Sequence, residues 1–411
     1  MLTIFILFIL IAITLFGLFV AKLGKFGPFN PFTLFFFGSW AAIFIMYAVF
    51  QDVYYPVPEE YLLIQVCVHL FAFFVMIGSQ LSKPIAKQPA LPYEYVLNKK
   101  LFTLLQIALL LALPAFYQMV VSYAGQSIFT STGYTRLRYA FNNEGRDMGR
   151  LGYLYSFAFL SAAIGVLYAA KNQLNKWQAV LSILIALIYA FLTTGRTFFL
   201  MTFLFAVVPL ALLGKLKVKS LMILSGVLLS FFLLVASLTS KGASTDASFS
   251  DNMSSFIESA HSYLIAPFVA LSMQMSEFDA PALGEYSLRF FFSVLAALGL
   301  TNRPMSLVRG YEFTPAPTNL YTVYEVYVRD FAVFGFFLPV LFLPIHWYLY
   351  KKARRGHELY IIIYAISTYP LLTQVLQDQY MTLISTWIQL FIGCWLLMKK
   401  RKKPIPETPS E

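Results

Sequence analysis

The feature that most constrains this chain is a succession of apolar runs, each about 17 to 22 residues long and separated by short charged stretches. A helix of about 20 residues matches the thickness of the hydrocarbon core of a bilayer. Hydrophobic residues make up 59% of the 411 residues and charged residues only 12%, whereas soluble domains carry about 25% charged residues. The pattern excludes a soluble enzyme, a disordered chain and a disulfide scaffold. It predicts an all-α, polytopic integral membrane protein.

Eleven apolar runs predict about eleven transmembrane helices in a single membrane-embedded domain over residues 1–411. The stretch Trp177–Leu213 has 37 residues, which is too long for one spanning helix of about 20 residues. We therefore expect two helices with a break at Thr193–Arg196, where Gly195 can turn the chain. The predicted spans lie near residues 2–21, 31–50, 61–82, 101–121, 151–170, 178–194, 197–213, 220–238, 331–350, 359–376 and 381–398.

Basic residues between the runs predict the orientation of the chain. Lys22 and Lys25 directly follow the first run, so the positive-inside rule places that end in the cytoplasm and the N-terminus outside. Alternation then puts the tail, residues 399–411, in the cytoplasm. The predicted cytoplasmic segments hold 20 of the 30 basic residues, and 17 of these are lysines. Topology thus explains the net charge of +11, which gives no reason to expect nucleic acid as a partner.

The ten remaining basic residues fall on the predicted periplasmic side, mostly in two loops at residues 122–150 and 239–330. Nine of the ten are arginines, a preference that topology does not explain. A guanidinium group binds phosphate or carboxylate oxygens through two hydrogen bonds at once. We therefore interpret the outer face as an anion-binding site, carried by Arg136, Arg138, Arg146, Arg150, Arg196, Lys241, Arg289, Arg303, Arg309 and Arg329.

Four arginines precede the fifth run and could together hold a diphosphate. Arg146 and Arg150 would share one helix face if that helix begins early, with Arg136 and Arg138 just upstream. The alternative is a cluster that reaches to anionic lipid headgroups. Arg196 lies in a tight turn and should have a polar partner or line a wet cavity, unless it is a plain interfacial anchor.

The large outer loop contains a segment suited to sugars. Pro317 should end what precedes it and Asn319 can cap a helix from Leu320 that would stack Tyr321, Glu325 and Arg329 on one face. The alternative is a local ion pair with interfacial tyrosines. Two apolar stretches in this loop are too short to span and should be re-entrant or interfacial: Leu264–Met275 and Phe290–Leu300.

Candidates for a general base are few on the outer side. Asp378 is the one acidic residue near the last outer turn, and it could be a base or a plain loop carboxylate. His261 is the single histidine in an outer loop, where a structural role is the alternative. The sequence has no P-loop, glycine-rich nucleotide fingerprint or metal-ligand spacing, so we expect no metal and no cofactor.

The chain resembles the Wzy-type O-antigen polymerases, the oligosaccharide repeat-unit polymerases of the bacterial inner membrane. The resemblance covers the polytopic layout and the order and spacing of three motifs: Thr193-Thr194-Gly195-Arg196, Pro317-Thr318-Asn319-Leu320-Tyr321-Thr322, and Gln377-Asp378-Gln379-Tyr380-Met381-Thr382 with the following Ser385-Thr386-Trp387-Ile388-Gln389.

The resemblance implies an inverting, metal-independent glycosyltransferase of the GT-C type at the periplasmic face. The donor would be a glycan on undecaprenyl diphosphate, and the acceptor a single repeat unit on a second undecaprenyl diphosphate. Membrane lipid and a chain-length regulator protein would be further partners. The implied catalytic residues are Arg196, Asp378, Glu325 and His261. The diphosphate would be the anion held by arginines of the outer face, namely Arg136, Arg138, Arg146, Arg150, Arg196 and Arg329. The implied sugar-binding residues are Asn319, Tyr321, Tyr324 and Tyr380.

Two other functions stay open at this level. An O-antigen ligase would use the same lipid donor but transfer the glycan to lipid A core. A flippase or transporter for lipid-linked oligosaccharides would make no bond, and such proteins commonly carry charges within their spans or an internal repeat. The spans of this chain are nearly free of charge, and its polar residues gather on one side.

Overall fold

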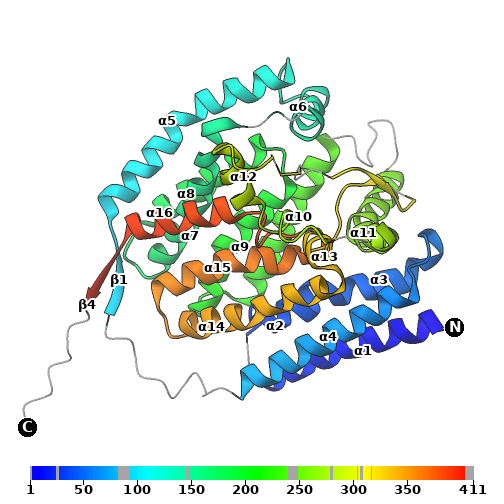
Figure 1. Ribbon diagram of the computed structural model, residues 1–411. Coiled ribbons are helices and arrows are strands. Elements are labelled where there is room, and N and C mark those ends of the chain that lie inside the picture. Colours follow the sequence, from blue (N-terminus) through cyan, green and yellow to red (C-terminus); the bar gives the residue numbers. More distant parts are fainter. Residues whose placement is uncertain are drawn as a thin grey trace, which may run out of the picture.

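The computed structural model describes residues 2–24, 27–81, 93–144, 146, 148–238, 249–277, 281–302, 304–305, 309–315 and 317–402, and these are mostly helical (Figure 1). Two of the outer basic residues of the sequence analysis, Lys241 and Arg303, lie outside the described residues. The α-helices of the first half are α1 (Leu2–Leu23), α2 (Pro31–Thr33), α3 (Ala42–Phe50), α4 (Glu59–Gln80), α5 (Lys99–Ala124), α6 (Ser131–Asn143), α7 (Tyr153–Ala170), α8 (Lys176–Leu192) and α9 (Arg196–Leu212).

The second half of the chain continues the helical pattern and adds short strands. Its helices are α10 (Val218–Leu238), α11 (Phe249–Met273), α12 (Arg289–Ala297), α13 (Glu325–Phe331), α14 (Phe342–Arg354), α15 (Glu358–Leu372) and α16 (Ile384–Leu397). The strands are β1 (Tyr93–Leu97), β2 (Glu312–Phe313), β3 (Pro317–Thr318) and β4 (Met398–Lys402). Two short two-stranded sheets, β1–β4 and β2–β3, accompany the helices, and the mostly helical structure is consistent with the all-α prediction.

Each predicted apolar run is helical in the described residues. Six helical stretches are long and apolar enough to cross a membrane, which supports the prediction of a polytopic membrane protein. Further apolar helices are shorter, with 10–17 residues, and include α8, α9 and α16. The six longer stretches are Leu2–Leu23, Pro31–Val53, Glu59–Gln80, Lys99–Ala124, Gly149–Ala170 and Glu325–Arg354.

Helix α7 lies at the centre of the bundle. It packs against α5, α8, α9, α15 and α16, and most of its length is buried on all sides. Small residues allow this close approach: a Cβ added at Gly165 would lie 3.2 Å from the Ser182 Oγ atom and 3.3 Å from the Ala179 Cα atom. Helices in membranes associate through such small-residue contacts, so α7 sets the spacing of its neighbours.

The predicted cytoplasmic segments gather at one end of the bundle, which we call the lysine end. Strands β1 and β4 pair antiparallel there, so the start of the predicted tail lies beside the segment before α5 (Figure 1). Lys171 forms an ion pair with Glu358, which also accepts a hydrogen bond of 3.1 Å from the backbone N–H of Tyr95. These contacts agree with the prediction that the segments share one side of the membrane.

Two short apolar stretches of the large predicted loop have different surroundings. Leu264–Met275 begins within the second half of α11, which is buried, and the Phe268 ring contacts the rings of Phe44, Tyr47 and Tyr61. Aromatic side chains of α3 and α4 cover that face, so this stretch is not interfacial, and the other alternative, a re-entrant segment, stays a prediction. Phe290–Leu300 includes α12, which has no buried residue and exposes several large apolar side chains, as the interfacial prediction requires.

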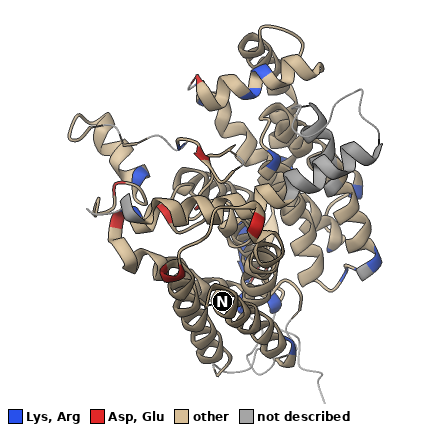
Figure 2. Cartoon of the chain, turned by 90° about the vertical axis from the view of Figure 1, so that its right-hand side faces the viewer, with Lys and Arg blue, Asp and Glu red and all other residues tan. Residues whose placement is uncertain are grey.

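The end opposite the lysine end carries the described outer arginines, and we call it the arginine end. Figure 2 looks onto the right-hand side of Figure 1, where basic and acidic residues lie on loops, short helices and helix ends while most of the helix length is uncharged. Acidic residues accompany the arginines there, so a site for an anion depends on which arginines converge rather than on the net charge of this end.

Candidate functional site

Two adjoining pockets lie at the arginine end. The first, with a volume of about 240 Å³, we call the arginine pocket; the second, with about 90 Å³, we call the amide pocket. Both are lined by Gln377 and Gln379, which therefore stand at their junction. The arginine pocket is lined by Arg138, Phe141, Asn142, Thr193, Thr194, Gly195, Arg196, Thr197, Phe198, Tyr263, Leu320, Thr373, Leu376, Gln377 and Gln379.

The turn between α8 and α9 places Arg196 in the arginine pocket. The predicted break is confirmed: α8 ends at Leu192 and α9 begins at Arg196. The residue with positive φ in this turn is Thr194, at 56°, whereas Gly195 is extended at −85°. Gly195 is instead needed for space, because a Cβ there would lie 2.5 Å from the Phe198 ring. The glycine thus permits close packing under the pocket rather than the reversal of the chain.

Arg138 reaches the same pocket from α6, a helix that sequence reasoning had treated as loop. Thr130 caps α6 by accepting a hydrogen bond from the N–H of Gly133, and α6 packs against α5 and α10. The positive charges of Arg138 and Arg196 act on each other across the pocket. Two guanidinium groups on one cavity, from helices far apart in sequence, form a site suited to an anion with two phosphates.

The other three arginines of the predicted cluster do not line either pocket. Arg136 pairs with Glu144, the guanidinium of Arg146 lies 5.6 Å from the centre of the Tyr123 ring, and Arg150 is exposed. The predicted shared helix face of Arg146 and Arg150 is wrong, because α7 begins only at Tyr153. Gly149, with a φ of 50°, is the first residue of a single 3-10 turn, Gly149–Gly152, so no α-helix joins Arg146 to Arg150.

The amide pocket brings the other two motifs together. It is lined by Arg309, Asn319, Tyr321, Thr322, Glu325, Val326, Gln377, Asp378, Gln379, Thr382 and Leu383. Asn319 and Tyr321, predicted to bind sugar, both line it. Amide, hydroxyl and aromatic groups around one cavity can pair with sugar hydroxyls and pack against the apolar faces of a sugar ring.

The predicted helix from Leu320 begins one turn later, at Glu325. The backbone N–H of Val323 donates a hydrogen bond of 2.6 Å to the carbonyl of Gln374, a tertiary contact that competes with the helical pattern. Tyr321 thus lies in the preceding turn, where its hydroxyl donates to the carbonyl of Gly310 at 2.9 Å. Burial raises the pKa of Tyr321 to about 12, so this hydroxyl stays protonated at neutral pH.

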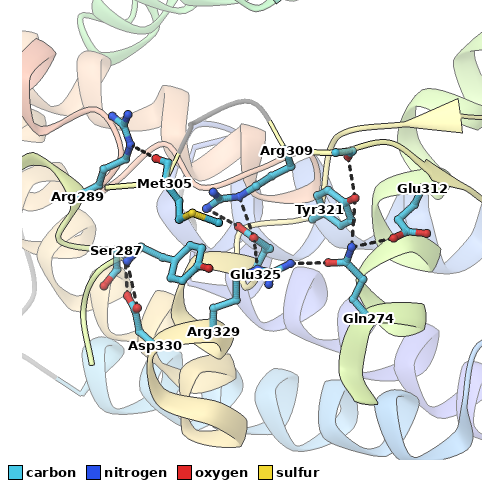
Figure 3. A network of polar contacts seen from close by, with 12 residues as sticks. Gln274, Ser287, Arg289, Met305, Arg309, Glu312, Tyr321, Glu325, Arg329 and Asp330 are labelled. Carbon is cyan, nitrogen blue, oxygen red and sulfur yellow. Dashed lines mark hydrogen bonds and ion pairs between the residues drawn. The ribbon is translucent and has the colours of Figure 1, made fainter. Parts of the chain in front are cut away.

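Glu325 lines the amide pocket and is held between two arginines (Figure 3). Its side chain is 5% exposed and pairs with Arg309 at 2.9 Å and with Arg329, four residues along α13. Arg329 also donates to Gln274 at 2.7 Å, and Gln274 donates to Glu312 and to Tyr321. The Glu325 carboxylate is engaged by two guanidinium groups, so the network fits a binding wall better than a proton acceptor.

Asp378 is buried at 3% exposure and lines the amide pocket. Its carboxylate accepts four hydrogen bonds of 2.9 to 3.1 Å, from the Tyr327 hydroxyl and the backbone N–H groups of Tyr380, Met381 and Thr382. Burial raises the pKa of Asp378, while the hydrogen bonds from Thr382 and Tyr327 act in the opposite direction. The side chain therefore shapes the turn before α16 that presents Gln377 and Gln379 to both pockets.

Three predicted site residues pack elsewhere. The His261 ring stacks on Phe50 at 4.6 Å between ring centres, and its Nδ1 atom lies 2.6 Å from the Tyr54 hydroxyl. Tyr324 is fully buried and stacks on Trp40. Tyr380 stacks on a neighbouring phenylalanine ring within the core. None of the three lines either pocket, so no described geometry assigns them to catalysis or to sugar binding.

Sequence reasoning missed several pocket residues. Arg309 is one of the outer arginines but was not among the predicted diphosphate ligands, and Gln377 and Gln379 belong to the third motif but were not among the predicted site residues. No feature of the sequence distinguished Tyr263 of α11 as a site residue, since one tyrosine in a helix is ordinary. Within the described part of the chain, no three or more His, Cys, Asp or Glu residues group as metal ligands would.

No protein-family model, curated protein or solved structure matches this chain.

Proposed function

We propose that this protein is a membrane-embedded glycosyltransferase that polymerises oligosaccharide repeat units carried on undecaprenyl diphosphate. One observation carries the proposal: an arginine pocket suited to a diphosphate adjoins an amide pocket suited to sugar, and Gln377 and Gln379 line both. A sugar diphosphate lipid has these two parts joined by a single bond. The enzyme would span the bacterial inner membrane about eleven times, in a GT-C-like arrangement, with both pockets facing the periplasm.

The reaction would be a single displacement. A hydroxyl oxygen of the acceptor repeat unit attacks the anomeric carbon of the donor glycan, and the bond from that carbon to the diphosphate oxygen breaks. The electron pair leaves with undecaprenyl diphosphate, and the configuration at the carbon inverts. Arg138 and Arg196 would stabilise the negative charge that develops on the leaving group, without a metal ion.

The proton of the attacking hydroxyl must pass to a base. Asp378 is the acidic residue of the amide pocket that has no arginine partner among the described contacts, so it is the candidate that the proposal retains. Glu325 is engaged by two arginines, and His261 lies outside both pockets. If Asp378 serves only to hold the turn, the released diphosphate or solvent would take the proton.

The test is a reconstitution of the full-length protein in liposomes with one purified undecaprenyl-diphosphate-linked repeat unit. The expected products are a ladder of longer glycans on undecaprenyl diphosphate and one free undecaprenyl diphosphate for each bond made. The double variant Arg138→Ala/Arg196→Ala is the negative control. Transfer only when lipid A core is added would identify a ligase. Movement of the lipid across the bilayer with no release of undecaprenyl diphosphate would identify a flippase or transporter.

A further inference from the structure

Helix α9 carries more than the arginine at its first position. Phe199, Phe203, Ala206 and Leu210 follow Arg196 at spacings of three or four residues, so they share one face of the helix. This face lines a third hollow of about 170 Å³, which we call the apolar groove. Its lining comes from four helices, α7 to α10, and consists of Val166, Ile183, Leu187, Phe199, Thr202, Phe203, Ala206, Val207, Leu210, Leu224, Val227 and Leu228.

The apolar groove offers almost no polar group to a ligand. The single polar side chain of its lining is Thr202, whose hydroxyl already donates to the carbonyl of Phe198 at 2.9 Å. A ligand held there must therefore be aliphatic. From Arg196 to Leu210 the helix rises about 20 Å, and on α9 the groove lining begins at Phe199, directly after Phe198 of the arginine pocket.

Helix α9 bounds both the apolar groove and the arginine pocket. Arg196 and Phe198 of α9 line the pocket, and Phe199 and Phe203 of the same helix line the groove. Helix α10 packs against α9 and also against α6, which carries Arg138. A ligand with a doubly charged head and a long apolar tail can thus occupy both sites at once without leaving this group of helices.

We propose that the apolar groove binds the first isoprenoid units of the polyprenyl chain whose diphosphate lies between Arg138 and Arg196. The inference rests on the proposed function, which supplies the class of lipid. It adds the location of the lipid tail. The occupant is a polyprenyl chain rather than the acyl chain of a bilayer phospholipid, because the head pocket presents two guanidinium groups and a phospholipid such as phosphatidylglycerol carries one phosphate.

The experiment uses the full-length protein in lipid nanodiscs and undecaprenyl diphosphate with a diazirine on an isoprenoid unit near the diphosphate. After illumination, labelled peptides are identified by mass spectrometry. We expect the label on α9 and α10, with at least tenfold less label when unmodified undecaprenyl diphosphate is added in excess. Phosphatidylglycerol at the same excess should leave the label unchanged.

Two variants place a phenylalanine in the groove, and a matched control variant places one elsewhere on the protein. Ala206→Phe and Val227→Phe each place a larger side chain in the lining, and each should reduce the label on α9 and α10 at least tenfold. Ala12→Phe makes the same change on an exposed position of α1, so its labelling should equal that of the unmodified protein. Val227 is 48% exposed, so its variant folds even if Ala206→Phe does not.

Label confined to helices other than α7 to α10, or equal competition by phosphatidylglycerol, would overturn the proposal. So would full labelling in both groove variants. The result of this labelling experiment is independent of the result of the polymerisation assay that tests the proposed function. Label in the groove without glycan polymerisation supports the lipid site and rejects the enzyme activity. Polymerisation with no label in the groove supports the activity and rejects this site for the tail.

Discussion

Arg138 of α6 and Arg196 of α9 line one pocket, where burial and the positive charge of Arg138 lower the pKa of Arg196. Bringing two guanidinium groups together is unfavourable unless an anion joins them, so the arrangement favours binding of a phosphorylated group. The lining of this pocket, as far as the described residues form it, includes no aspartate or glutamate. The buried carboxylates Glu325 and Asp378 line the neighbouring amide pocket instead.

Arg138 and Arg196 should both contribute to the rate of glycan transfer. If Arg196 stabilises the leaving group, Arg196→Ala should cost on the order of 3 kcal/mol, or about a hundredfold in rate. Arg196→Lys keeps the charge but loses the planar fork and should keep partial activity. Arg138→Ala should resemble Arg196→Ala. The rates are measured in liposomes at equal protein levels.

Arg146→Ala is the matched control, since Arg146 is exposed and lies over Tyr123 outside both pockets. It should transfer glycan at the unmodified rate. Normal polymerisation by Arg196→Ala would reduce Arg196 to an interfacial anchor.

The pH dependence should report on Asp378. The hydroxyl of Tyr327 donates to the Asp378 Oδ1 atom at 2.9 Å and so lowers the pKa of that carboxyl. Removing the hydroxyl in Tyr327→Phe raises the pKa, because the carboxylate loses a donor that favours its charged form. If Asp378 accepts the proton, the acidic limb of the pH–rate profile should move to higher pH. A drop in thermal stability with an unmoved limb would assign Asp378 to positioning alone.

Glu325 should matter more for stability than other acidic residues of the arginine end. Glu325→Gln leaves Arg309 and Arg329 facing each other without the charge that joins them, which should cost on the order of 3 kcal/mol in unfolding free energy. Glu144→Gln, at an exposed pair with Arg136, should cost less than about 1 kcal/mol. Thermal unfolding in detergent measures both, and equal midpoints would contradict the role given to Glu325.

Accessible cysteines should reveal the orientation of the chain in the membrane. In a variant whose Cys67 and Cys394 are replaced by alanine, single cysteines at Asn172 and Lys217 should be shielded from a membrane-impermeant thiol reagent in intact cells. Cysteines at Glu144 and Gly299 should react, because the positive-inside rule places the arginine end outside. The reverse pattern would put both pockets in the cytoplasm and reject the periplasmic reaction.

Glycan transfer should survive chelation of divalent cations. Arginine would supply the positive charge that a metal ion supplies in other transferases. Polymerisation in liposomes should keep the same rate with EDTA as without it. A rate that vanishes with EDTA and returns with magnesium or manganese would contradict the proposed mechanism.

The sequence by itself determined the class of the protein and the place of its helices. Apolar run length and charge spacing are local properties, and they predicted helices at every run, the break at Thr193–Arg196 and the gathering of lysine-rich segments at one end. The three motifs also predicted the segments that meet around the pockets. These inferences hold because a backbone in an apolar medium must satisfy its hydrogen bonds within each segment.

Only the tertiary structure decided which side chains converge. Among the arginines before α7, Arg138 reaches the pocket while Arg136, Arg146 and Arg150 do not. The helix expected from Leu320 begins at Glu325, since the Val323 N–H bonds to Gln374 far along the chain. Which side chains line a pocket depends on how helices remote in sequence pack against one another. Neither the periodicity nor the charge pattern of a segment encodes that packing. The packing of α6, α9 and α11 around one cavity is therefore a property of the folded chain alone.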